Sequence, residues 1–124
     1  MFKVNEDKSI YVTRGDAVSF KLSAATEDGN YTFRVGDLVR FKVFERKACD
    51  RVVLKKDFRV EAEADTIDIV LAGEDTKFGS IISKPKDYWY EVELNPEIHP
   101  QTIIGYDEAG EKILRLYPEG GDTE

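Results

Sequence analysis

Few side chains in this 124-residue sequence have the chemistry of a catalytic or metal site, and those few are scattered. The sequence contains one histidine, His99, and one cysteine, Cys49. General acid–base and nucleophilic catalysis need a base beside its target, and histidine-rich metal sites need several imidazoles. His99 stands between isoleucine and proline in an expected loop, and no motif beside Cys49 activates a thiol. We expect a surface loop residue at position 99 and, at position 49, a small residue near a hairpin tip or in the core.

Carboxylates are numerous, and Glu91 and Glu93 share one face of an expected strand beside Trp89. A glycosidase instead holds two carboxylates across a cleft from each other. The sequence contains neither an EF-hand pattern nor a glycine-rich phosphate loop. It therefore predicts a non-enzymatic protein with no catalytic residue, no cofactor and no metal. An enzyme that gathers several carboxylates in one pocket is the least supported alternative.

One recognition motif occurs at residues 14–16, which spell the integrin-binding tripeptide Arg-Gly-Asp. A tripeptide arises often by chance, and here the glycine and aspartate are typical of a turn between two strands. Adhesion through this motif is therefore a minor alternative.

Composition and charge narrow the classes of partner. The net charge is −7, with 41% apolar and 35% charged residues. An acidic chain without a long basic run is a poor partner for nucleic acid or an anionic membrane. The N-terminal segment turns charged at once, unlike a signal peptide, and no apolar run approaches the length of a membrane span. We expect no nucleic acid and no membrane as partners, and a protein made in the cytoplasm that is not secreted by a signal peptide.

The dominant pattern is alternation of apolar and polar residues, which indicates strands with one buried face. It predicts strands at residues 10–12, 17–23, 38–45, 51–55, 66–71, 87–94, 102–106 and 112–117. Residues 58–62 either continue the strand at 51–55 or start a new one. Within residues 51–55 it places Val52 and Leu54 on one face. About seven to nine short strands without a long helix predict an all-β fold, namely an immunoglobulin-like antiparallel β-sandwich.

The C-terminal part of the sequence predicts a hairpin and a tail. Residues 107–110 contain a glycine suited to a hairpin turn between the last two expected strands. Residues 1–117 are expected to form a single β-sandwich domain, followed by a flexible acidic tail at 118–124. The strand with Tyr88 and Tyr90 resembles the strand that carries a tyrosine corner in immunoglobulin-like domains.

The aromatic residues suggest a surface for contacts. Trp89, Tyr88, Tyr90 and Tyr106 are numerous enough for a platform that binds sugars or peptides. Alternation turns Tyr88 and Tyr90 inward, however, and leaves Trp89 on the other face, where a subunit contact is the better interpretation. Leu38, Phe44 and Trp89 fall on the faces of their strands that are turned away from the core. We predict these three as interface residues.

The order of motifs resembles a known group of proteins. Four segments carry the resemblance. They are a strand followed by a turn at 10–16, a turn followed by a strand at 31–43, an alternating strand at 67–76 and a tyrosine-rich strand at 88–94. In this order they resemble small proteins of phages and prophages of Gram-positive bacteria. They are similar to the immunoglobulin-like N-terminal domain of phage baseplate upper proteins, over most of residues 9–117.

The resemblance implies a function in assembly. A non-enzymatic structural component of a phage or prophage tail or baseplate is expected, located in the virion after assembly and in the bacterial cytoplasm before it. Its partners would be other virion proteins, with a second copy of the chain as a further candidate. The alternative is a binding module for a cell-surface glycan or peptide, which would use an aromatic platform or an exposed sheet edge.

Overall fold

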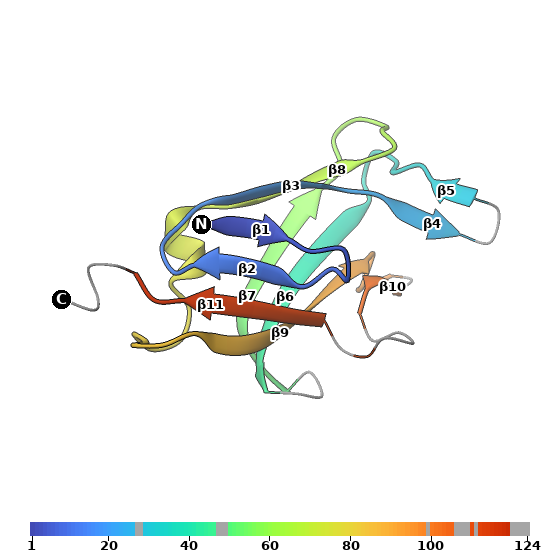
Figure 1. The fold of residues 1–124 in the computed structure, drawn as a ribbon. Helices are drawn as coiled ribbons and strands as arrows, with labels where there is room; N and C mark the ends of the chain where they lie inside the picture. The colour runs from blue at the N-terminus through green and yellow to red at the C-terminus, as the bar shows by residue number, and fades with distance from the viewer. Residues whose placement is uncertain (27–28, 47–49, 99, 106–109, 111, 120–124) are drawn as a thin grey trace.

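The computed structural model spans the whole chain and describes residues 1–26, 29–46, 50–98, 100–105, 110 and 112–119 (Figure 1). His99, Cys49, Tyr106 and most of the expected tail at 118–124 lie outside the described residues. The predictions made for those positions stay predictions.

The described residues form eleven strands and one short 3-10 helix, which confirms the all-β prediction. The strands are β1 (Phe2–Val4), β2 (Ile10–Thr13), β3 (Val18–Leu22), β4 (Ala24–Thr26), β5 (Gly29–Tyr31), β6 (Leu38–Arg46), β7 (Asp50–Arg59), β8 (Ile67–Leu71), β9 (Lys86–Leu94), β10 (Gln101–Ile104) and β11 (Lys112–Tyr117). The 3-10 helix η1 (Gly73–Thr76) lies between β8 and β9. The short strands β1, β4 and β5 were not predicted from the sequence.

Six of the strands follow one path across a large sheet. Their order is β1-β2-β11-β9-β6-β7, and β10 adds a seventh strand by pairing with β9. Two-stranded sheets are formed by β3 with β8 and by β4 with β5. The β2–β11 pair is parallel, so the expectation of a purely antiparallel fold is wrong there. A hairpin forces its two strands to be antiparallel, whereas β2 and β11 are far apart in the sequence and are free of that constraint.

One hydrophobic core joins the large sheet to the β3–β8 pair, which lies at the top of the view in Figure 1. The large sheet and the β3–β8 pair both contribute buried apolar residues to this core. They include Val18, Leu22, Ile69 and Leu71 from the pair, and Val12, Val39, Phe41, Tyr90 and Leu114 from the large sheet. Each strand buries alternate side chains, as in β9, whose four inward residues are buried between half-buried ones. Burial of these faces is the main force that holds the two layers together.

The predicted hairpin between the last two strands is wrong. Both β10 and β11 pair with β9, because β10 takes the half of β9 that ends at Leu94 and β11 takes the half around Tyr88. β9 and β10 are joined instead by the turn that begins at Asn95. The glycine in the 107–110 segment is a local turn signal, and it carries no information about which strand edge is open to receive β11.

The tyrosine-corner interpretation is also wrong. A tyrosine corner bonds to the backbone a few residues upstream of the tyrosine. Here the Tyr90 hydroxyl donates a hydrogen bond to the backbone carbonyl of Lys8, which is 82 residues upstream. The Tyr90 ring stacks on Phe41, with ring centroids 5.5 Å apart. This tyrosine therefore ties the β1–β2 turn to the core.

Candidate interaction surface on the outer sheet face

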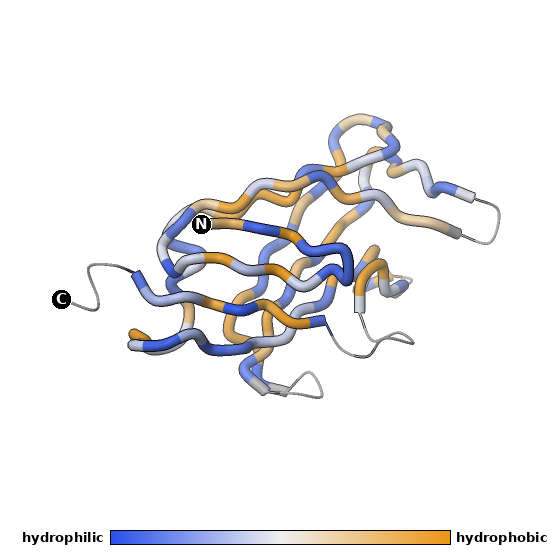
Figure 2. The backbone as a smooth tube through the Cα atoms, viewed as in Figure 1, coloured by the Kyte–Doolittle hydropathy of each residue, from blue (hydrophilic) through white to orange (hydrophobic). Residues whose placement is uncertain are grey.

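The large sheet has a face turned away from the core, called here the outer face. Figure 2 shows hydrophobic and hydrophilic residues alternating along the strands of this sheet. On β9 the inward residues are buried, and Trp89, Glu91 and Glu93 are half-buried on the outer face. The register between neighbouring strands then fixes which outer residues lie side by side.

Four apolar residues line up across four strands of the outer face. Trp89 on β9 is paired with Ile113 on β11 and, on its other side, with Phe44 on β6. Phe44 is in turn paired with Val52 on β7. Directly opposed residues on neighbouring strands are in side-chain contact range. We call these four residues, Ile113, Trp89, Phe44 and Val52, the apolar row.

The structure brings together two of the three predicted interface residues. Trp89 and Phe44 are cross-strand neighbours in the apolar row. Leu38 lies at the opposite end of β6, paired with Arg59, and its backbone N–H donates a 2.8 Å hydrogen bond to Asn95 Oδ1. Leu38 therefore belongs to a different part of the outer face. Whether any of the three contacts a partner stays a prediction.

Phe44 is less accessible than the sequence suggested. It is only 4% exposed, although it is not a member of the core cluster. Trp89 and Val52 cover it from either side, and the Lys42 ammonium lies 5.6 Å from the centre of its ring. Phe44 is therefore covered within the sheet face, although its direction away from the core is as predicted.

Val52 and Ile113 are the members of the row that the sequence analysis missed. Alternation placed Val52 on the same face as Leu54. In the structure Leu54 pairs with Val43 and Val52 pairs with Phe44, so that Val53 is an extra residue, a β-bulge. The bulge turns Val52 outward, where it is 49% exposed. Ile113 follows from simple alternation in β11 and could have been predicted.

Ion pairs border the apolar row on the side toward the end of β9. Lys42 pairs with Glu93 across the β6–β9 ladder. Arg40 donates two hydrogen bonds to Asp57, at 2.8 and 3.1 Å, and one to Glu97 at 2.9 Å. The Arg40 hydrogen bonds lower the pKa of the Asp57 carboxyl from its ordinary value. These carboxylates are neutralised by cations, and Glu93 in particular is engaged by Lys42 rather than facing a second carboxylate across a cleft.

A second polar group borders the row on the side of β2 and β11. Arg115 donates a 2.7 Å hydrogen bond to Asp87, and its guanidinium lies 5.1 Å from the centre of the Tyr11 ring. Tyr11 and Tyr117 meet edge to face with ring centroids 5.9 Å apart. An apolar centre between polar borders is the usual anatomy of a protein–protein interface.

The Arg-Gly-Asp tripeptide is not displayed for recognition. The side chain of Arg14 is 9% exposed, and its guanidinium donates a 3.0 Å hydrogen bond to the Lys77 carbonyl. Gly15 donates its backbone N–H to the Thr76 hydroxyl at 2.9 Å. The motif is part of the contact between the β2–β3 turn and η1, which contradicts the adhesion alternative.

The described residues contain no group of three or more histidine, cysteine, aspartate or glutamate side chains arranged to hold a metal ion. No helix in the described part of the chain is long and apolar enough to cross a bilayer. Comparison with known proteins finds no matching family model, no similar curated protein and no similar solved structure.

Proposed function

We propose that this protein is a non-enzymatic structural component that acts through protein–protein assembly, in the tail or baseplate of a phage or prophage. The single observation that supports assembly is the apolar row Ile113–Trp89–Phe44–Val52 on the outer face. The support for a phage origin is the order of motifs in residues 9–117, which resembles small phage proteins. The partners would be other virion proteins or a second copy of the chain.

The composition of the row fits a contact surface better than a solvated face. Tryptophan is among the residues that contribute most to binding energy at interfaces, and it does so best when neighbouring side chains exclude water from it. Trp89 has Phe44 and Ile113 as its two cross-strand neighbours. Ion pairs on both borders would form the polar rim.

The finer description of the fold belongs to the same proposal. Two layers that pack on one core, with β2 and β11 paired in parallel, support an immunoglobulin-like sandwich.

The experiment begins with the genes that flank this one. If they encode tail proteins, their products are the partners to test by co-purification and analytical ultracentrifugation. Trp89→Ala and Val52→Ser are expected to weaken the complex at least tenfold without loss of folding.

The control is Val70→Ser, because Val70 has the same 49% exposure as Val52 but lies on β8, outside the large sheet. Equal binding by Val52→Ser, Trp89→Ala and the control would exclude the outer face as the contact. Flanking genes for metabolism or surface polysaccharide would exclude the phage role.

A specific observation favours a second candidate function, which is the binding of a cell-surface glycan. Tyr11 and Tyr117 lie together on the outer face beside the Arg115–Asp87 pair. Aromatic rings next to charged hydrogen-bonding groups are suited to the apolar faces and hydroxyls of a sugar. Titration with host cell-wall polysaccharide tests this. Binding that is lost in Tyr11→Ala and kept in Trp89→Ala would favour the glycan over assembly.

A further inference from the structure

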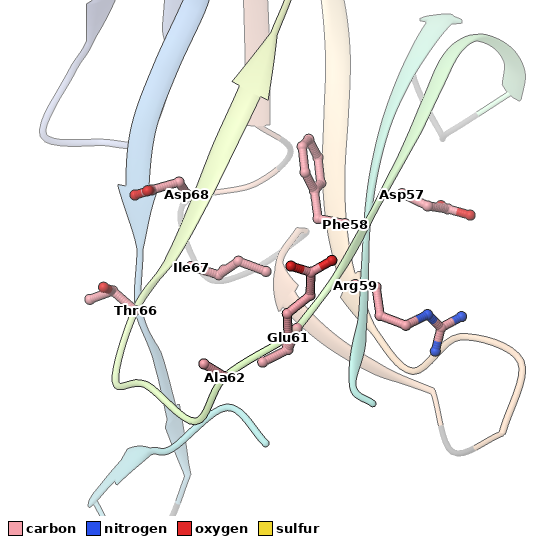
Figure 3. A pocket seen from close by; sticks show the side chains of 9 residues that line it. Asp57, Phe58, Arg59, Glu61, Ala62, Thr66, Ile67 and Asp68 are labelled. Carbon is pink, nitrogen blue, oxygen red and sulfur yellow. The ribbon is translucent and has the colours of Figure 1, made fainter. Parts of the chain in front are cut away.

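A cleft lies between the end of β7 and the start of β8, two strands that belong to different sheets. Its volume is about 540 Å³, within the range of about 300–1,000 Å³ that is typical of pockets that hold ligands. Phe58, Ile67 and Glu61 point into the space between the strands, whereas Asp57 and Arg59 point away from it (Figure 3). An occupant of the cleft would therefore be recognised through its side chains.

The cleft combines apolar walls with an acidic border. Phe58 and Ile67 are half-buried and pack against the core cluster, which fixes their positions. Residues 60–68 include no lysine or arginine but four exposed carboxylates, those of Glu61, Glu63, Asp65 and Asp68. Of these, Glu61 and Glu63 make no hydrogen bond or ion pair with any other described residue. The cleft thus suits a ligand that offers an apolar side chain next to a cation.

The chain itself carries such a segment at residues 79–86, which lead into β9 and are called here the basic loop. The basic loop contains two lysines and no acidic residue. Ile81 is 69% exposed, whereas its neighbour Ile82 packs against the core cluster. Lys84 is exposed and forms no ion pair within the described part of the chain. Pro85 fixes one backbone angle next to Lys84, which lowers the entropy that the loop loses on binding.

The cleft and the basic loop lie at opposite ends of the molecule. In Figure 1 the segment that leads into β9 is at the lower left, and the segment between β7 and β8 is at the upper right. A chain therefore cannot place its basic loop in its own cleft, whereas a second copy can. A contact between two different patches on identical subunits is heterologous, and its repetition gives a closed ring or an open filament.

We propose that copies of this chain associate head to tail, with the basic loop of one copy in the cleft of the next. Ile81 enters between Phe58 and Ile67, and the removal of these apolar surfaces from water supplies the affinity. Lys84 approaches Glu61 at the border, and this charge pairing fixes the orientation of the loop. The proposal rests on the proposed function only for its setting in an assembly. It uses neither Trp89 nor the other members of the apolar row, which stay available to another partner.

Sedimentation velocity of the full chain over a range of concentrations tests the contact. Species larger than the monomer are expected to grow with concentration, and a monomer at the highest soluble concentration overturns the proposal. Ile81→Ser should associate about tenfold more weakly, because it removes the apolar side chain that the cleft buries. Ile98→Ser is the matched control, because Ile98 is 87% exposed and does not line the cleft. Equal association of the two variants contradicts the role of Ile81.

A mixing experiment tests the head-to-tail arrangement. Glu61→Lys places a cation in the cleft, where it repels Lys84, and should also associate about tenfold more weakly. Ile81→Ser keeps its cleft and Glu61→Lys keeps its basic loop, so an equimolar mixture should form a 1:1 dimer with the affinity of the unaltered contact. A mixture that stays monomeric overturns the proposal.

Two further variants separate this contact from other effects. Glu6→Lys makes the same change in net charge as Glu61→Lys at an exposed position that does not line the cleft, and should associate like the unaltered protein. An equal loss in Glu6→Lys and Glu61→Lys would contradict the role of the cleft. Association that is lost in Trp89→Ala but kept in Ile81→Ser would assign it to the apolar row and overturn the head-to-tail contact. The opposite result would support this contact and count against the apolar row.

Discussion

Tyr88 and Tyr90 are two residues apart on β9 and both point into the core, yet only the hydroxyl of Tyr90 has a hydrogen-bond partner among the described residues. The Tyr90 hydroxyl donates to the Lys8 carbonyl, whereas the Tyr88 hydroxyl is buried without a partner. The two side chains are 0% and 2% exposed, respectively. The same chemical group is thus satisfied at one position and unsatisfied at the other.

Removal of the two hydroxyls is expected to have opposite effects on stability. Tyr90→Phe should cost about 0.5–1.5 kcal/mol of unfolding free energy, because it breaks a hydrogen bond and leaves the Lys8 carbonyl without that donor. Tyr88→Phe should be neutral or stabilising, because it removes a buried polar group that has no partner. Denaturant unfolding of both variants measures the difference. Equal losses in the two variants would contradict the assigned hydrogen bonding.

The Tyr88 hydroxyl also limits what residue fits at Gly79. Gly79 has φ +72°, and a Cβ at this position would lie 2.5 Å from the Tyr88 oxygen. Gly79→Ala is expected to cost about 2–3 kcal/mol, of which about 1–2 kcal/mol is backbone strain. In a double-mutant cycle, adding Tyr88→Phe to Gly79→Ala should recover the part of the lost unfolding free energy that is not backbone strain.

Gly36→Ala is the matched control for this cycle. Gly36 has φ +96°, but nothing lies within 4 Å of its added Cβ. The Gly36→Ala variant should lose only the unfolding free energy that corresponds to backbone strain, and this loss should not change when Tyr88→Phe is added. If Gly79→Ala cost no more than Gly36→Ala, the close approach of Tyr88 would have no energetic effect.

The Thr76 hydroxyl joins η1 to the β2–β3 turn. It accepts the Gly15 N–H at 2.9 Å and lies 2.9 Å from the Asp16 carbonyl, within hydrogen-bond range. Thr76→Val keeps the shape of the side chain but leaves the Gly15 N–H without this acceptor, and should cost about 1–3 kcal/mol. Thr76→Ser keeps the hydroxyl and should lose clearly less. Thermal and denaturant unfolding of the two variants measure this, and a loss in Thr76→Ser as large as that in Thr76→Val would contradict the stabilising role of the hydroxyl.

The Arg40–Asp57 pair predicts how stability depends on acid. Hydrogen bonds from Arg40 lower the pKa of Asp57 in the folded protein below its ordinary value of 3.8. The pair therefore stabilises the fold at pH values above the pKa of Asp57 in the unfolded chain. This contribution is lost as the pH falls through the lower pKa of Asp57 in the folded protein. Asp57→Asn should flatten the fall in unfolding free energy below about pH 4.

The control for the acid prediction is Glu63→Gln, which alters an exposed carboxylate that makes no hydrogen bond with other described residues. It measures the effect of one lost negative charge outside the Arg40–Asp57 pair. Parallel curves for Asp57→Asn and the unaltered protein would exclude a stabilising Arg40–Asp57 pair.

The sequence predicted the strands better than their partners. Alternation located β6, β9 and β11 to within one residue, since each buries one face and the pattern reports burial directly. It ended the longest strand, β7, at residue 55 rather than at Arg59. It missed β1, whose residues Phe2, Lys3 and Val4 bury little and are held by pairing with β2. It also predicted the wrong partner for β11, because strand pairing depends on contacts that are distant in the sequence.

The candidate site shows the same limit. Trp89 and Phe44 were found by alternation alone, and the register then made them neighbours. Val52 was placed on the wrong face, because a single extra residue in a strand inverts the face of every residue beyond it. A bulge has no reliable signature in the alternation itself. The apolar row could therefore be seen only once the pairing of β6 with β7 was known.

The parallel pairing of β2 and β11 determines how the domain would bear a mechanical load. The pairs run from Ile10 beside Leu114 to Thr13 beside Tyr117, so the chain enters β2 and leaves β11 at opposite ends of the ladder. Tension applied through the flanking segments would pull the two strands past each other and load all of these pairs at once, rather than peel them one by one. The antiparallel β1 lies outside this clamp and would detach first, leaving the rest of the domain intact under tension.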